Sequence, residues 1–147
     1  MDTLARNVLA PLILRAALAV VFVYHGMGKL GPDNEWGLSW NKEMPGALQA
    51  LVAWGEFLGG IAMAIGFLVR LAALGLASIM VGAIVTVHGA NGFALMSKDR
   101  EPTKLGYEYN LALIAICMGV ALLGSGILGL DHWLWQSKRG TGTPPQR

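Results

Sequence analysis

Charged residues are scarce in this chain of 147 residues: they make up only 14% of it, whereas a soluble domain usually carries about 25%. Apolar residues account for 54%, and the longest apolar stretches contain at most two charges each. The net charge of +2 is too small to indicate a polyanionic partner. The composition therefore excludes an ordinary soluble domain and a nucleic-acid binder.

Cysteine is almost absent. Cys117 is the one cysteine, and it lies inside an apolar run. A disulfide scaffold, a CxxC redox motif and a cysteine-based zinc site are all excluded, and Cys117 itself is expected to act as a small apolar packing residue.

No segment has the alternating polarity of a membrane β-strand, but four apolar segments have the roughly 20 residues that cross a bilayer as a helix. These predicted spans are residues 8–28, 45–67, 71–90 and 107–130. The first is interpreted as a retained helix and not as a cleaved signal, because Arg15 interrupts it and it continues to Lys29. We therefore predict an all-α, membrane-embedded antiparallel four-helix bundle in residues 1–135, followed by a disordered polar tail in residues 136–147.

The lengths of the connections predict the topology. Two long connections, residues 30–44 and 91–106, follow the first and third spans, so both belong on one side, which we call the loop side. The first is expected to form a short amphipathic helix on the membrane, where its Trp36 and Trp40 suit an interfacial aromatic belt. Basic residues divide equally between the two sides, and Arg15 favours cytoplasmic termini in a multi-pass protein of the cell membrane.

The polar side chains inside the predicted spans are the candidate functional residues, because such groups are costly in lipid and normally face the bundle interior. At about 100° per residue, Arg15, His25 and Lys29 lie within an arc of roughly 80° on one helix. Glu56 lies in the second span, about 14 Å from the loop side at 1.5 Å per residue. The loop-side ends of the third and fourth spans supply His88, Asn91, Glu108 and Asn110. The sequence thus predicts a polar pocket in the loop-side half of the bundle.

Each candidate has a structural and a functional interpretation. Glu56 either forms an ion pair with Arg15 that fixes two helices, or accepts and relays a proton. Lys29 either extends to the head groups, or holds an anionic ligand oxygen together with His25, which is one turn away on the same face.

The remaining candidates are weighed in the same way. His25 and His88 could ligate a haem axially, but without a CxxCH motif a haem is not expected, and no metal site is predicted from the spacing of the histidines and carboxylates. Glu108 and Asn110 either cap the fourth helix or contribute to the pocket.

Gly55 and Gly59 form a GxxxG pattern, which is typical of close helix packing in membranes.

The ordered set of these motifs resembles the DoxX family. Arg15 with Gly26-Met27-Gly28-Lys29 resembles its R…GxxK pattern, and Glu56-Phe57-Leu58-Gly59-Gly60 followed by Arg70 resembles its next two helices. The second half is matched by His88-Gly89-Ala90-Asn91, Glu108, Gly124-Ser125-Gly126 and Leu130-Asp131. The resemblance implies a four-helix membrane protein, of a kind associated with membrane oxidoreductase systems that include quinone-linked thiosulfate oxidation.

Two functions are compatible with these observations. In the first, the chain is a subunit or accessory of a membrane oxidoreductase, and its pocket binds a quinone or a small anion. Glu56 then accepts a proton, His25 and Lys29 stabilise negative charge on the ligand, and Arg15, His88, Asn91, Glu108 and Asn110 help to bind it. In the second, the chain is a non-catalytic membrane scaffold or small-molecule carrier. Both predict lipid as a partner and no nucleic acid, and both leave other redox subunits and a homo-oligomer open.

Overall fold

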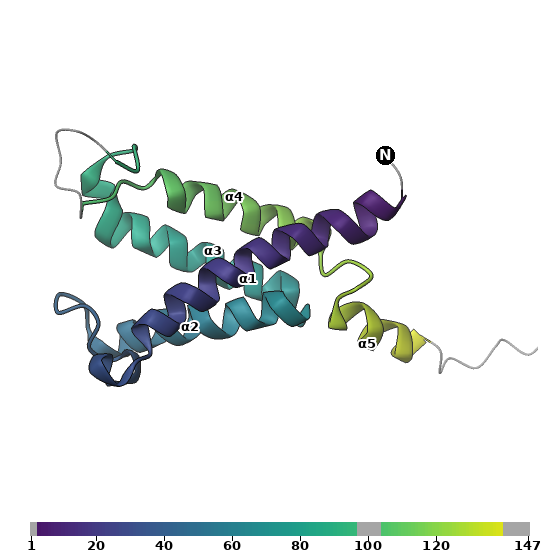
Figure 1. Cartoon of the computed structure of the whole chain (residues 1–147), viewed down its shortest axis with the longest axis horizontal. Helices are drawn as coiled ribbons and strands as arrows, with labels where there is room; N and C mark the ends of the chain where they lie inside the picture. Colours follow the sequence, from purple (N-terminus) through teal and green to yellow (C-terminus); the bar gives the residue numbers. More distant parts are fainter. Residues whose placement is uncertain (1–2, 97–103, 140–147) are drawn as a thin grey trace, which may run out of the picture.

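The computed structural model describes residues 3–96 and 104–139, and within these ranges every regular element is helical (Figure 1). The larger helices are α1 (Ala10–Lys29), α2 (Gly46–Ile65), α3 (Val69–Ala83), α4 (Glu108–Leu123) and α5 (Leu130–Arg139). Shorter helical segments are η1 (Ala5–Leu9), η2 (Pro32–Gly37), η3 (Ile84–His88) and η4 (Gly89–Asn91). The prediction of an all-α protein is confirmed.

Three continuous helices in the described part are long and apolar enough to cross a membrane. They are Ala5–Lys29 with 25 residues, Gly46–Ile65 with 20 and Val69–Asn91 with 23. The first joins η1 to α1, and the third joins α3 to η3 and η4. These helices correspond to the first three predicted spans.

The fourth apolar helix is shorter than the predicted segment of residues 107–130. α4 has 16 residues, about 24 Å at 1.5 Å per residue, against a hydrocarbon thickness of roughly 30 Å. It ends at Leu123 because Gly124 (φ +79°) and Gly126 (φ +68°) turn the chain through conformations that favour glycine.

Two further predictions differ from the structure: where the tail begins, and the helix in the first long connection. Residues 136–139, predicted as tail, belong to α5, and residues 140–147 lie outside the described part. The predicted amphipathic helix of the first connection is only the six-residue 3-10 segment η2. Glu35 and Trp36 have positive φ there, so the segment cannot continue as an α-helix.

The helices pack in pairs. α1 lies mainly on α2 and α3 mainly on α4, while α2–α3 and α1–α4 contacts join the pairs. The apolar core between them contains Leu18, Phe22, Met63, Leu76, Cys117 and Val120. Figure 1 shows the α1–α2 pair and the α3–α4 pair separating toward the end that carries both long connections. A cavity lies at that end of the fold.

Two glycines allow the backbones of α1 and α2 to touch. A Cβ atom on Gly26 would lie 2.6 Å from the Phe57 nitrogen, and one on Gly60 would lie 2.7 Å from the Val23 nitrogen. The Gly55–Gly59 pattern instead faces α3, against the side chains of Ile79 and Leu76. Because backbone atoms cannot give way as a flexible side chain can, Gly26 and Gly60 fix how closely α1 and α2 approach.

At the end opposite the long connections, Arg15 ties three segments together. The residue is 2% exposed, and its guanidinium donates hydrogen bonds to the carbonyls of Met63 (2.9 Å) and Ala64 (3.1 Å) near the end of α2. A third bond goes to the Ser125 carbonyl at 2.6 Å, after α4. The last carbonyls of a helix have no partner within the helix, so Arg15 satisfies groups that would otherwise be buried without one.

Asp131 of α5 completes this end of the fold. Its two carboxylate oxygens accept the backbone N–H groups of Leu68 (2.7 Å) and Val69 (2.9 Å), and its own N–H donates to the Gly66 carbonyl at 2.9 Å. A carboxylate at the beginning of a helix is favourable because the first amides there have no other acceptor. α5 is thereby attached to the turn between α2 and α3.

Replacing Gly26 or Gly60 by alanine should destabilise the protein by about 1–3 kcal/mol, the usual cost of overpacking. Gly28→Ala is the matched control, because a Cβ at Gly28 meets nothing within 4 Å. Thermal unfolding of the purified protein should give a lower Tm for the first two variants and no loss for the control. Equal Tm values for all three would contradict the close α1–α2 contact.

Arg15→Met should destabilise the protein by at least about 3 kcal/mol, since three hydrogen bonds from a charged group are lost. Arg15→Lys should lose less, because it keeps the charge. The losses of Arg15→Met and Glu56→Gln should add in the double variant, since residues without a shared partner behave independently. If the double variant instead loses much less stability than the sum of the two single losses, measured in the same unfolding assay, Arg15 and Glu56 interact directly.

Candidate functional site

A cavity of about 460 Å³ lies at the end of the fold that carries the long connections. Its walls come from α1, α2, α3, η3 and α4, together with residues of both connections. The volume lies within the range of about 300–1,000 Å³ that is typical of small-molecule sites. Five of the eight candidate functional residues line it: His25, Lys29, Glu56, His88 and Asn110. We call this space the loop-end cavity.

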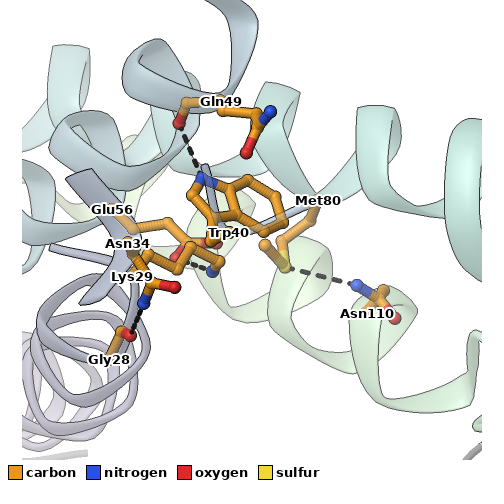
Figure 2. A network of polar contacts seen from close by, with 8 residues as sticks. All are labelled: Gly28, Lys29, Asn34, Trp40, Gln49, Glu56, Met80 and Asn110. Carbon is orange, nitrogen blue, oxygen red and sulfur yellow. Dashed lines mark hydrogen bonds and ion pairs between the residues drawn. The ribbon is translucent and has the colours of Figure 1, made fainter. Parts of the chain in front are cut away.

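Lys29 and Glu56 form an ion pair in the cavity wall (Figure 2). The Glu56 side chain is 5% exposed and that of Lys29 is 21% exposed. The ion pair with Arg15, one of the two interpretations of Glu56 from the sequence, is therefore wrong, because Lys29 is the partner of Glu56. Arg15 binds Met63, seven residues or roughly 10 Å farther along α2 than Glu56.

Trp40 covers this ion pair. The Lys29 ammonium nitrogen lies 5.2 Å from the centroid of the Trp40 ring, within the range of a cation–π interaction. The indole N–H donates to the Gln49 carbonyl at 3.1 Å (Figure 2). The sequence predicted an interfacial role for Trp40, and its place in the cavity follows from how the first connection folds back onto α2.

Gln49 holds that connection in place. Its amide is buried, accepts the Asn41 N–H at 2.7 Å and donates to the Met44 carbonyl at 2.6 Å. Trp40, Asn41 and Met44 all line the cavity. Sequence reasoning missed Gln49, although it is a polar residue near the start of an apolar span and therefore needs a partner.

The opposite wall is formed by α3 and α4 and is less polar. The buried Asn110 amide donates to the Met80 sulfur at 3.5 Å (Figure 2). The hydroxyls of Ser78 and Thr86 bond to carbonyls of their own helix at 2.9 and 2.8 Å. Asn110 is thus a buried polar side chain of α4 that also lines the cavity.

His88 lies where this wall meets the second long connection. Its Nδ1 is 3.0 Å from the Leu105 carbonyl. A carbonyl can only accept, so Nδ1 is the protonated nitrogen, and a neutral ring then has Nε2 as an acceptor. The loop contact orients the imidazole in the cavity wall.

Three candidate residues do not line the cavity. Arg15 is at the other end of the fold. Asn91 donates to the Leu105 carbonyl at 2.9 Å, and the Glu108 carboxylate accepts the Leu95 N–H at 2.9 Å. Asn91 and Glu108 therefore shape the second connection, and any effect they have on a ligand is through that loop.

His25 lies at the exposed edge of the cavity, where its ring packs edge-on against Tyr24 with 5.7 Å between the centroids. Within the described residues, no three His, Cys, Asp or Glu side chains are grouped so that they could hold a metal ion. The site therefore offers one ion pair, several neutral hydrogen-bonding groups and a large apolar surface.

Comparison with known proteins gives two matches and one negative result. The DoxX family model matches residues 10–89, more than half of the chain. A protein of Bacillus subtilis (strain 168) named "Putative oxidoreductase CatD" is 26% identical over 129 residues, covering 87% of this chain and 89% of the relative. No solved structure matches the chain significantly. The matched region includes α1, α2, α3, η3 and four of the five candidate residues that line the cavity, His25, Lys29, Glu56 and His88, and on this match the chain belongs to the DoxX family.

Proposed function

We propose that the protein is a multi-pass protein of the cell membrane and that its loop-end cavity binds a quinone as part of a membrane oxidoreductase system. The observation that carries the proposal is the Lys29–Glu56 ion pair, with its carboxylate buried, in the wall of a largely apolar cavity. In the proposed arrangement α1 to α4 form an antiparallel bundle with both termini in the cytoplasm. The three long apolar helices support the membrane placement.

The charge balance of the cavity favours a quinone over a small anion. Lys29 is already neutralised by Glu56, so the pair contributes no net charge. An anion would lose its hydration on entering without meeting an unpaired cation, which is costly. A quinone is neutral, and its ring and tail suit the apolar walls while its oxygens can accept hydrogen bonds.

The polar groups can be given distinct roles toward such a ligand. The Lys29 ammonium donates a hydrogen bond to one ligand oxygen, and Trp40 restricts the position of that ammonium. Asn110 and His88 on the other wall provide polar groups for a second oxygen. His25, at the exposed edge, stabilises negative charge that develops on the ligand as a proton leaves.

Glu56 is the proposed proton acceptor. Oxidation of a quinol to a quinone releases two protons and two electrons, and each proton leaves from a hydroxyl oxygen of the ligand. Glu56 takes the proton from the oxygen near Lys29 and passes it on toward the exposed edge of the cavity, Nε2 of the neutral His88 ring accepts the proton from the second oxygen, and the two electrons go to a redox partner such as a cytochrome. The name of the Bacillus subtilis relative as an oxidoreductase agrees with this class of reaction.

The first test separates ligand binding from structural stability. Replacing the whole ion pair by Lys29→Met with Glu56→Met should leave the stability within about 1–2 kcal/mol, because an apolar pair often substitutes for a buried ion pair at little cost. Binding of decylubiquinone, measured by calorimetry in detergent, should weaken by at least about tenfold, equivalent to one charged hydrogen bond.

The matched control for this test is Lys42→Met with Glu43→Met. Both residues are exposed, adjoin the cavity residues Asn41 and Met44, and do not line the cavity themselves. The control should bind decylubiquinone as the wild type does. Equal binding by all three proteins would remove the ion pair from the ligand site, and a wild-type protein that binds no quinone would favour the scaffold or carrier function.

The second test addresses the proton. Glu56→Gln keeps the shape of the side chain but cannot accept a proton from a quinol. In membranes from cells that produce the protein, decylubiquinol oxidation coupled to reduction of two molecules of cytochrome c should fall by about 100-fold, within the range that general-base catalysis contributes. Decylubiquinone binding should change much less than turnover. Unchanged turnover in Glu56→Gln would refute the proton-acceptor role.

A further inference from the structure

A second cavity, of about 970 Å³, lies at the opposite end of the fold, beside the turn between α2 and α3 and the turn after α4. We call it the basic cavity. Its wall includes two guanidinium groups, of Arg6 and Arg70, and the carboxylate of Asp131. None of these residues contributes to the loop-end cavity or to the function proposed for it.

The two arginines are brought together from separate segments. Arg6 belongs to η1, and the adjacent Asn7 carbonyl accepts the Ile127 N–H at 3.0 Å, which holds η1 against the turn after α4. Arg70 belongs to the first turn of α3, and its guanidinium lies along Gly124, where a Cβ atom would be in ordinary contact with Nε at 3.4 Å. Arg70 therefore packs against the turn after α4.

The charges of the basic cavity do not balance. Both Asp131 oxygens are already used by the N–H groups of Leu68 and Val69. Within the part of the chain that the structure describes, neither Arg6 nor Arg70 has an ion pair or a side-chain hydrogen bond. Two arginines against one carboxylate leave the cavity with a net positive charge, which favours an anion, and guanidinium groups match phosphate oxygens in geometry.

The rest of the cavity wall indicates where that phosphate comes from. Leu71 (67% exposed), Leu122 (77%) and Ile127 (48%) line the same cavity. A free phosphate has no use for this apolar surface, whereas an acyl chain would cover it. We propose that the basic cavity binds an anionic phospholipid, with the lipid phosphate on Arg6 and Arg70 and an acyl chain along Leu71 and Leu122. The proposal rests on the membrane placement proposed above, but not on quinone binding.

Native mass spectrometry of the detergent-purified protein tests the site with phosphatidylglycerol as the anionic lipid and phosphatidylcholine as the zwitterionic one. Wild type should bind phosphatidylglycerol more tightly. The double variant Arg6→Gln with Arg70→Gln should lose at least about tenfold in phosphatidylglycerol affinity, since each arginine near the lipid surface attracts the anionic head group. Phosphatidylcholine binding should hardly change.

Two control variants guard against a folding defect or a general charge effect. Arg6→Lys with Arg70→Lys keeps both charges and should retain most of the affinity for phosphatidylglycerol. Lys42→Gln removes one exposed charge at the other end of the fold and should bind as the wild type does. Equal phosphatidylglycerol affinity in wild type and in the double glutamine variant would overturn the proposal.

Competition identifies the occupant. Inorganic phosphate and glycerophosphoglycerol, which lack acyl chains, should not displace phosphatidylglycerol at concentrations comparable to the lipid, and displacement by either would assign the site to a free anion instead. The double glutamine variant should still bind decylubiquinone, because the loop-end cavity contains neither arginine. A wild type that binds phosphatidylglycerol but no quinone would support this site while refuting the quinone function.

Discussion

The close contact between α1 and α2 is the constraint on which both ends of the structure depend. Gly26 and Gly60 let the two backbones touch, and this contact fixes the register of one helix against the other. With that register, Lys29 lies beside Glu56, and Arg15 reaches the last carbonyls of α2. A slip of one helix against the other would separate both sets of partners at once and leave charges buried without compensation, at a cost of several kcal/mol.

The two cationic side chains of α1 are satisfied in different ways, and the difference decides what each end can do. Arg15 binds backbone carbonyls, so its hydrogen bonds are used to close the fold. Lys29 binds a carboxylate and lies under an indole at the edge of a cavity. A backbone carbonyl cannot change its protonation state, whereas a carboxylate can. The Lys29–Glu56 end is therefore the one suited to proton chemistry.

The sequence was sufficient to predict the three long apolar helices and the gathering of polar side chains near the long connections, because both follow from the cost of polar groups in an apolar environment. It did not predict the partner of Glu56. Helical periodicity placed Arg15 and Lys29 on the same stripe, and the choice between them depends on the α2 carbonyls that Arg15 binds. Gln49 was missed for a related reason, since its partners belong to a connection whose path no periodicity describes. The sequence predicted that the fourth helix continues to residue 130, because an apolar run extends beyond Leu123. The helix ends earlier because Gly124 and Gly126, with positive φ angles, turn the backbone there.

The same comparison of charges explains why the two cavities are proposed to hold different ligands. In the loop-end cavity the Lys29 cation is matched by a carboxylate that it contacts, so a neutral molecule loses least by entering it. In the basic cavity two guanidinium groups share the wall with one carboxylate, that of Asp131, whose oxygens accept the amides that begin α3, so the cavity keeps a net positive charge for an anion. The ligand proposed for each cavity therefore depends on whether the carboxylate binds the neighbouring cation or backbone amides. Asp131 therefore has two effects: it caps α3, and by doing so it leaves the neighbouring arginines available to a ligand.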